Sequence, residues 1–139
     1  MTYEMTILGD VPSKANSYKI ITIGSHASLA KTQNLKEYEK AFFLQCPYRG
    51  VDISAFFSIE IDVFYANNRK DLDGAFKVLL DCLQQCKVIR NDRECVAITA
   101  RKMVDKANPR VFIRITPVDG VEAHKAAKKP VARQKGLFD

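Results

Sequence analysis

The 139-residue chain has no tryptophan, only two histidines, and no C-x-x-C pair among its four cysteines. A structural zinc site needs clustered cysteine and histidine ligands. We therefore expect no zinc and four free thiols. Cys82 and Cys86 lie one helical turn apart, a spacing that suits a metal or redox pair or, more commonly, two small buried thiols.

Long apolar runs are also absent. No stretch approaches the roughly eighteen apolar residues of a membrane-spanning helix, and the N-terminal sequence M-T-Y-E-M-T lacks the shape of a secretory signal. These absences predict a cytoplasmic protein. A hydrophobic content of 47% and a charged content of 27% are typical of a globular domain, and 139 residues suffice for one small core.

The net charge of +6 is unevenly distributed along the chain. Residues 123–139 hold five cations and one acid, so the remainder is nearly neutral. We predict a folded domain over residues 1–117 and a basic, disordered tail over 118–139. The positive charge points towards a polyanionic partner, and the domain then needs a local patch of cations to bind one, although scattered solubilising charge explains any single lysine equally well. The candidate residues for such a patch, which would bind DNA if DNA is the polyanion, are Lys14, Asn16, Arg69, Lys70, Arg93 and Lys102.

Alternation of apolar and polar residues predicts five strands. They are Met5–Leu8, Tyr18–Ile23, Ala55–Ala66, Cys95–Val104 and Arg110–Thr116. A helix is expected over Asn34–Gln45, with Asn34 or Thr32 as its N-cap, and a second helix should begin near Asp73. The small residues of Gly24–Thr32 suggest a flexible connection.

The second helix joins two predicted strands and should form a right-handed unit in which those strands run parallel. The last strand is expected to form a hairpin with its predecessor across Lys106–Pro109. The fold class is therefore α+β, a mixed β-sheet with two main helices. Glu60 and Asp62 alternate with apolar residues, which favours a solvated sheet face over a role as metal ligands.

Acidic residues gather at the start of the second helix. Helical geometry would place Asp71 about 200° from Asp73, so the pair can converge only if the backbone before the helix is extended. A single Asp here is usually a helix cap. Two carboxylates about 4 Å apart repel by about 4 kcal/mol at an effective dielectric near 20. Lys77 or a divalent cation must offset that repulsion, and carboxylates suit Mg²⁺ or Mn²⁺.

The stretch K-D-L-D-G-A-F-K-V-L-L-D-C-L, followed by I-R-N-D-R-E-C-V, closely resembles the signature of the RusA family of Holliday junction resolvases. That signature is D-x-D-N-x-x-K followed by a D-D pair. The segments V-P-S-K-A-N-S-Y-K and R-K-M also agree, and the resemblance covers roughly residues 5–116. Gly74 replaces the family's asparagine, and Asn91 replaces the first acid of the D-D pair, which questions the affinity for metal or the choice of metal.

The resemblance implies a RusA-like homodimer that nicks branched DNA, such as a four-way junction, with Mg²⁺ as cofactor and Mn²⁺ as a possible substitute. It implies that Asp71, Asp73 and Asp92 are catalytic metal ligands and that Lys77 assists them. A catalytically silent DNA-binding or regulatory protein of the same fold is the alternative, motivated by Asn91 and Gly74. A small phosphohydrolase is disfavoured because no glycine loop could cradle a nucleotide.

The end of the tail carries a second motif. Gln134, Leu137 and Phe138 resemble the Q-x-x-L-F peptide with which bacterial replication and repair proteins dock on the sliding clamp. Disordered tails normally lack apolar residues, so the two at the end of this tail favour a binding role. The competing interpretation is an uninformative terminus.

Overall fold

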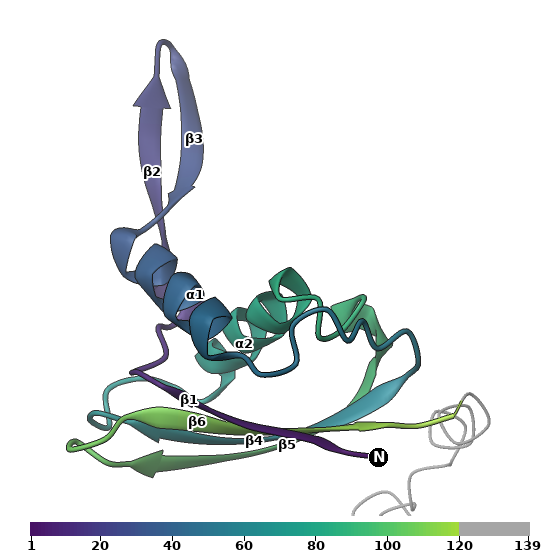
Figure 1. The fold of residues 1–139 in the computed structure, drawn as a ribbon. Coiled ribbons are helices and arrows are strands. Elements are labelled where there is room, and N and C mark those ends of the chain that lie inside the picture. Colours follow the sequence, from purple (N-terminus) through teal and green to yellow (C-terminus); the bar gives the residue numbers. More distant parts are fainter. Residues whose placement is uncertain (120–139) are drawn as a thin grey trace, which may run out of the picture.

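A four-stranded mixed sheet with two helices on one face forms the body of the protein in the computed structural model, which describes residues 1–119 (Figure 1). The strand order is β1-β6-β4-β5. The strands are β1 (Tyr3–Leu8), β4 (Phe57–Tyr65), β5 (Cys95–Val104) and β6 (Arg110–Pro117). β4 pairs with β5 in parallel, as predicted, and the α+β class is confirmed.

The predicted hairpin between β5 and β6 is wrong. Asp105 N donates to Tyr65 O at 2.8 Å, so the chain crosses the end of β4, and β6 pairs with the opposite edge of β4. β6 buries Val111, Ile113 and Ile115, whereas most side chains of β5 are at least partly exposed. Placing β6 inside the sheet and β5 at its edge buries more apolar surface.

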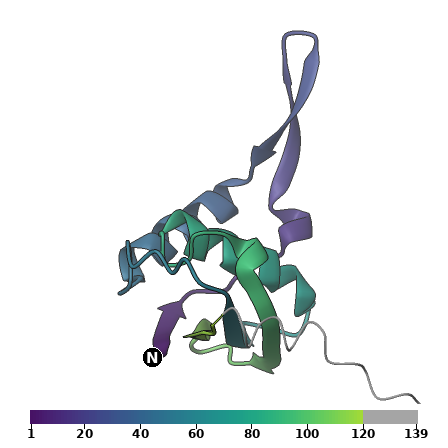
Figure 2. The same ribbon diagram turned by 90° about the vertical axis from the view of Figure 1, so that its right-hand side faces the viewer.

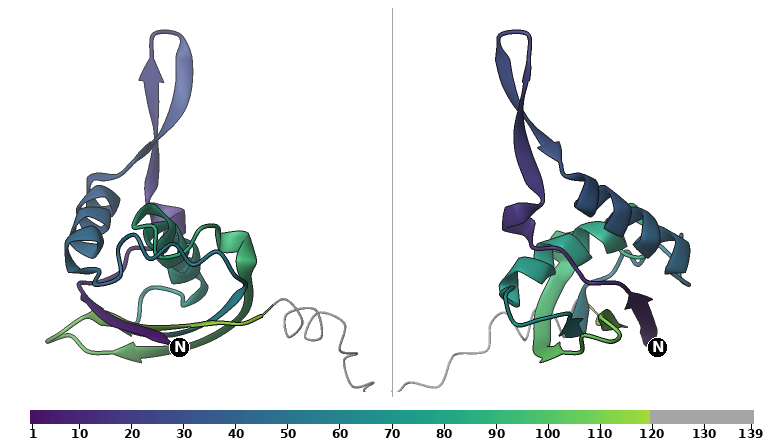
Figure 3. Two further views of the ribbon diagram at one scale, coloured as in Figure 1. Left: turned by 45° about the vertical axis from the view of Figure 1, so that its right-hand side comes forward. Right: turned by 90° about the vertical axis from the view of Figure 1, so that its left-hand side faces the viewer.

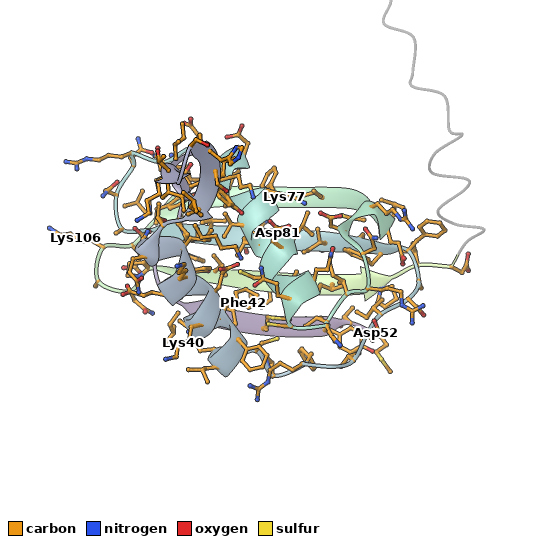
Figure 4. All side chains as sticks on the ribbon, turned by 90° about the horizontal axis from the view of Figure 1, so that it is seen from above. Lys40, Phe42, Asp52, Lys77, Asp81 and Lys106 are labelled. Carbon is orange, nitrogen blue, oxygen red and sulfur yellow. The ribbon has the colours of Figure 1, made fainter. Side chains whose placement is uncertain are left out.

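Helices α1 (Gln33–Gln45) and α2 (Asp73–Gln85) cover the apolar face of the sheet (Figure 4). Thr32 caps α1, because its Oγ1 accepts a hydrogen bond from Leu35 N at 3.3 Å. The core between the layers includes Phe42, Ile61 and Leu79, all inaccessible to solvent. The outer side of α2 therefore takes no part in this core packing.

Strands β2 (Tyr18–Ile23) and β3 (His26–Lys31) form a hairpin that projects from the body (Figures 1 and 2). The prediction of a flexible connection over Gly24–Thr32 is wrong. Gly24, with φ 63°, occupies the first position of a two-residue turn, where a primed hairpin turn accepts glycine. Thr32 N donates to Ser17 O at 2.9 Å and closes the base of the hairpin.

The outer face of the sheet is polar, as predicted. Glu60 pairs with Arg114 at 3.3 Å and Asp62 with Arg101 at 2.8 Å, so both acids have structural partners. All four cysteines are free thiols, and Cys82 and Cys86 lie buried in the core. Over residues 1–119, no helix is long and apolar enough to span a membrane. Residues 120–139, with Gln134, Leu137 and Phe138, lie outside the described part of the chain.

Candidate active site

The turn between β4 and α2 is held in place by Tyr65. β4 ends at Tyr65, one residue before the predicted end at Ala66. The Tyr65 hydroxyl donates a hydrogen bond to the Asp71 carbonyl at 3.1 Å. Burial, aided by the negative charges of Asp10, Asp71 and Asp73, raises the pKa of Tyr65 to about 12. The hydroxyl therefore stays protonated at neutral pH and acts as a donor.

A second set of contacts ties the same turn to the end of β1. Lys70 Nζ lies 2.9 Å from Asp10 Oδ2 and 3.1 Å from the Val11 carbonyl, while Asp10 Oδ1 accepts a hydrogen bond from Ala66 N at 3.1 Å. Lys102 Nζ, from β5, donates to the Lys70 carbonyl at 2.5 Å. We call the Asp10 and Lys70 pair the latch. Sequence reasoning missed Asp10, because a lone acid after a short strand has no diagnostic pattern.

The first turn of α2 leaves two carboxylates without structural bonds. Leu72 is already helical, with φ −60° and ψ −39°, and Gly74 N donates to the Asp71 carbonyl at 3.2 Å. The extended backbone predicted between Asp71 and Asp73 is therefore not found at Leu72. Within residues 1–119, the carboxylates of Asp71 and Asp73 make no capping bond or ion pair, and both residues are exposed. Because they do not cap the helix, the interpretation of these two acids as helix caps loses its support.

Gly74 allows a close approach by the polar loop near the N-terminus. A Cβ at Gly74 would lie 3.0 Å from Ser13 Oγ, so a larger residue would push Ser13 away. The short 3₁₀ helix η1 (Lys14–Asn16) follows Ser13, and Lys14 Nζ lies 3.5 Å from Asp81 Oδ2 on α2. The departure at Gly74 thus has a structural reason, and it places η1 beside the acids.

Lys77 lies at the centre of a charged cluster on α2. Its Nζ contacts Asp92 Oδ2 directly and lies 3.1 Å from Asp81 Oδ1 (Figure 4). The hydrogen bond that Lys77 donates to Asp92 is the largest cause of a raised Lys77 pKa, so the ammonium group remains charged at neutral pH. Asp81 had no separate role in the sequence analysis. In the structure it bridges Lys77 and Lys14.

Asp92 is positioned by the segment that follows α2. It begins the 3₁₀ helix η2 (Asp92–Glu94), and its backbone N donates to Gln84 Oε1 at 3.0 Å. Asn91 Oδ1 accepts a hydrogen bond from Arg93 N at 3.1 Å and caps η2. Asparagine and aspartate both serve as caps, so Asn91 retains the local structure although it carries no charge.

The structure does not assemble the predicted metal ligands into one cluster. Among residues 1–119, no group of three or more His, Cys, Asp or Glu side chains could hold a metal ion. Asp71 and Asp73 are available at the start of α2, whereas Asp92 is engaged by Lys77. The donor chemistry still fits a hard divalent cation, because all three groups supply carboxylate oxygens. Lys77 and a metal ion would therefore compete for the Asp92 carboxylate, of which the ion pair engages Oδ2.

The predicted DNA-binding residues divide into two groups. Lys70 and Lys102 stabilise the turn before α2, and Lys14 pairs with Asp81. Asn16, Arg69 and Arg93 are exposed. Arg93 also lines an open pocket of about 580 Å³ that none of the predicted catalytic acids reaches.

A comparison with protein families matches residues 12–116 to the family described as Endodeoxyribonuclease RusA. This match covers every described element except β1 and the last residue of β6. No curated protein matches the chain.

Proposed function

Since the chain belongs to the RusA family of endodeoxyribonucleases, we propose that it resolves four-way DNA junctions by paired nicks that require Mg²⁺. The family is one of nucleases that act on Holliday junctions. The observation that carries the proposal is that the carboxylates of Asp71 and Asp73 are exposed and make no structural bond within residues 1–119, with Asp73 one helical turn before Lys77.

The acids and the lysine divide the work. Asp71 and Asp73 bind the cation, and Tyr65 and the latch hold their backbone in position. When bound, Mg²⁺ supplies an activated water and neutralises charge on the leaving oxygen. Lys77 binds the scissile phosphate and stabilises the charge that grows in the transition state.

The contact between Lys77 and Asp92 suggests how DNA completes the site. A phosphate that approaches α2 competes with Asp92 for the Lys77 ammonium group, because both are anions. Once Lys77 has turned to the phosphate, Asp92 is free to join Asp71 and Asp73. The full set of ligands then forms only when DNA is present.

A homodimer would supply two such sites. A four-way junction has two-fold symmetry, and a two-fold dimer presents identical sites to opposite strands. Paired nicks at symmetric positions are the expected product. The site of action is expected to be the cytoplasm.

The decisive experiment is a nicking assay on a synthetic four-way junction with and without Mg²⁺. Paired nicks should require Mg²⁺ and disappear in Asp73→Asn, while binding to the junction remains. Asp62→Asn is the matched control, since Asp62 lies on the opposite face of the sheet with Arg101 and should retain activity. Equal cutting of duplex and junction would overturn the resolvase proposal.

A catalytically silent junction-binding protein is the second candidate, because Asn91 and Gly74 depart from the family signature. Asn91 caps η2 and Gly74 accommodates Ser13, so each departure also has a structural explanation. Junction binding without nicking in both Mg²⁺ and Mn²⁺ would favour this candidate.

The C-terminal motif supports a separate proposal, docking on a bacterial sliding clamp through Gln134, Leu137 and Phe138. Binding of the full chain to a purified clamp should be lost in Phe138→Ala. A peptide of residues 128–139 should compete for the clamp. The proposal fails if the peptide does not bind and the Phe138→Ala protein still does.

A further inference from the structure

Asp81 binds two lysines on the outer side of α2 (Figure 4). Its Oδ1 lies 3.1 Å from Lys77 Nζ, and its Oδ2 lies 3.5 Å from Lys14 Nζ. Lys14 comes from η1, which lies beside α2 (Figure 3), and its Nζ also donates to the Tyr18 hydroxyl at 3.0 Å. A neighbour on the same helix and a neighbour from a distant segment therefore meet on one carboxylate.

Helix stability accounts poorly for an acid at this position. A lysine four residues before an acid is the less stabilising order of such a pair. The side chain of Lys77 is 51% exposed, and an ion pair with so much contact with water contributes at most about 1 kcal/mol. Asp81 also lies outside the first turn of α2, where an acid would be favoured by the helix dipole.

Asp81 is too far along α2 to share a cation with Asp73. The two residues are eight positions apart, which is about 12 Å along the helix axis. The oxygen ligands of Mg²⁺ lie about 2 Å from the ion, so two ligands of one ion cannot be so far apart. Asp81 therefore stays available to Lys77 when a cation binds at the start of the helix.

Lys77 needs such a partner when DNA is bound. Within residues 1–119 its acidic partners are Asp92 and Asp81. In the proposed function Asp92 turns to the cation, and a lysine side chain without a partner regains about 2 kcal/mol of rotamer entropy. An ammonium group has three donors, so Lys77 can keep one on Asp81 and direct another to the phosphate.

We propose that Asp81 is a positioning residue, which keeps the Lys77 ammonium group directed at the scissile phosphate after Asp92 has turned to the cation. This inference rests on the proposed function and deepens it, because it names the group that orients Lys77. A negative charge beside a phosphate opposes DNA binding. Removal of the Asp81 charge should therefore lower the rate of nicking without lowering the affinity for DNA.

The test is Asp81→Asn, measured by single-turnover nicking of a four-way junction in Mg²⁺ and by fluorescence anisotropy for junction affinity. The rate at saturating protein should fall about tenfold, because Lys77 remains but is no longer held in place. Affinity should equal that of the wild type or rise by up to about threefold. Glu37→Gln is the matched control. It removes the same charge from α1, where Glu37 accepts a hydrogen bond from Gln33, and should leave the rate unchanged.

Two further variants separate charge from shape. Asn has the size of Asp without its charge, whereas Glu keeps the charge on a longer side chain, so Asp81→Glu should restore nicking to within about threefold of wild type. In a Lys77→Met background, Asp81→Asn should change the rate by less than about twofold, because no ammonium group is left to direct. Thermal unfolding midpoints should confirm that each variant folds.

A readout on the DNA-free protein follows the lysine itself. In Asp92→Ala, Asp81 is the acid that still holds Lys77 within residues 1–119. The NMR order parameter of Lys77 Nζ should therefore stay close to its wild-type value and fall when Asp81→Asn is added.

Four results would overturn the inference. They are an unchanged nicking rate in Asp81→Asn, an equal loss in Asp81→Glu, a loss that adds to that of Lys77→Met, and a loss of junction affinity that matches the loss of rate. A wild-type protein that binds the junction without nicking it would refute the nuclease proposal instead. The order parameter of Lys77 would then decide the inference, since a value unaffected by Asp81→Asn would refute it and a fall would leave the positioning by Asp81 standing.

Discussion

The first turn of α2 and the β2–β3 hairpin both present side chains to solvent, but they are held very differently. The turn before α2 is fixed by Tyr65, by the latch between Asp10 and Lys70, and by Lys102. The hairpin is tied to the body at its base, where Thr32 N bonds Ser17 O, and is free along its length. Chemistry on a phosphodiester requires reacting groups held within a fraction of an ångström, and the turn before α2 is the better held of these two regions.

The largest effect expected from this contrast is at Lys77. Lys77→Met should lower the rate of junction nicking by about 10²–10³-fold, as is typical when a charge-stabilising group is lost. Binding of Mn²⁺ to the DNA-free protein should tighten, because Asp92 loses its ion-pair partner. Calorimetric titration measures the second effect. Lys40→Met on α1 is the control, and unchanged Mn²⁺ affinity in Lys77→Met would contradict the role given to Asp92.

Breaking the latch should loosen the turn without affecting the hairpin. Asp10→Ala removes the side-chain acceptor of Ala66 N and the carboxylate partner of Lys70 Nζ, which keeps the Val11 carbonyl, and this should lower the free energy of unfolding by about 1–3 kcal/mol. Nicking should fall while junction affinity stays within about twofold of wild type, because phosphate contacts elsewhere supply most of it. Urea denaturation and anisotropy measure the two quantities. A parallel loss of affinity would show that the turn also contributes to DNA binding.

A smaller, local effect is expected at the tip of the hairpin. Gly24 has φ 63°, so Gly24→Ala adds a Cβ in an unfavourable backbone region, at a cost of about 1 kcal/mol, although the space around it is open. Hydrogen exchange should accelerate in β2 and β3 and remain unchanged in α2. Faster exchange in α2 would mean that the hairpin and the body unfold as one unit.

The smallest effect concerns the packing of Ser13 on Gly74. Gly74→Ala should gain helix propensity of up to about 1 kcal/mol, offset by the 3.0 Å approach to Ser13 Oγ. In a Ser13→Ala background the clash with the hydroxyl is removed, so the same change should stabilise by about 0.5 kcal/mol more. A double-mutant cycle measured by thermal unfolding tests this. Additive effects would show that Ser13 does not restrict residue 74.

The helices and strands were predicted well where the spacing of apolar residues and the helix caps indicate the same element. Alternation defined β4 and β5 closely, and helical spacing defined α1 and α2. β3 was missed because its Ala and Ser residues do not pack against the core and therefore show no clear alternation of apolar and polar residues. The place of β6 was also missed, since alternation identifies a strand but not its neighbours.

The candidate site likewise has residues that the sequence predicted and contacts that only the structure revealed. Spacing and family resemblance selected Asp71, Asp73, Lys77 and Asp92. The contacts of Asp10, the bridging position of Asp81 and the capture of Asp92 by Lys77 depend on which segments meet in space. Sequence spacing identifies neighbours within one helix or strand, but it does not predict contacts between segments that are distant in the sequence.

The sequence alone determined the α+β class and the family signature, because both are properties of residue order and local period. Tertiary structure decided that residues 18–31 project as a hairpin, that β6 lies inside the sheet, and that Lys77 pairs with Asp92. These outcomes depend on the burial of apolar surface and on charge pairing between distant segments, and both are set only when the whole chain packs.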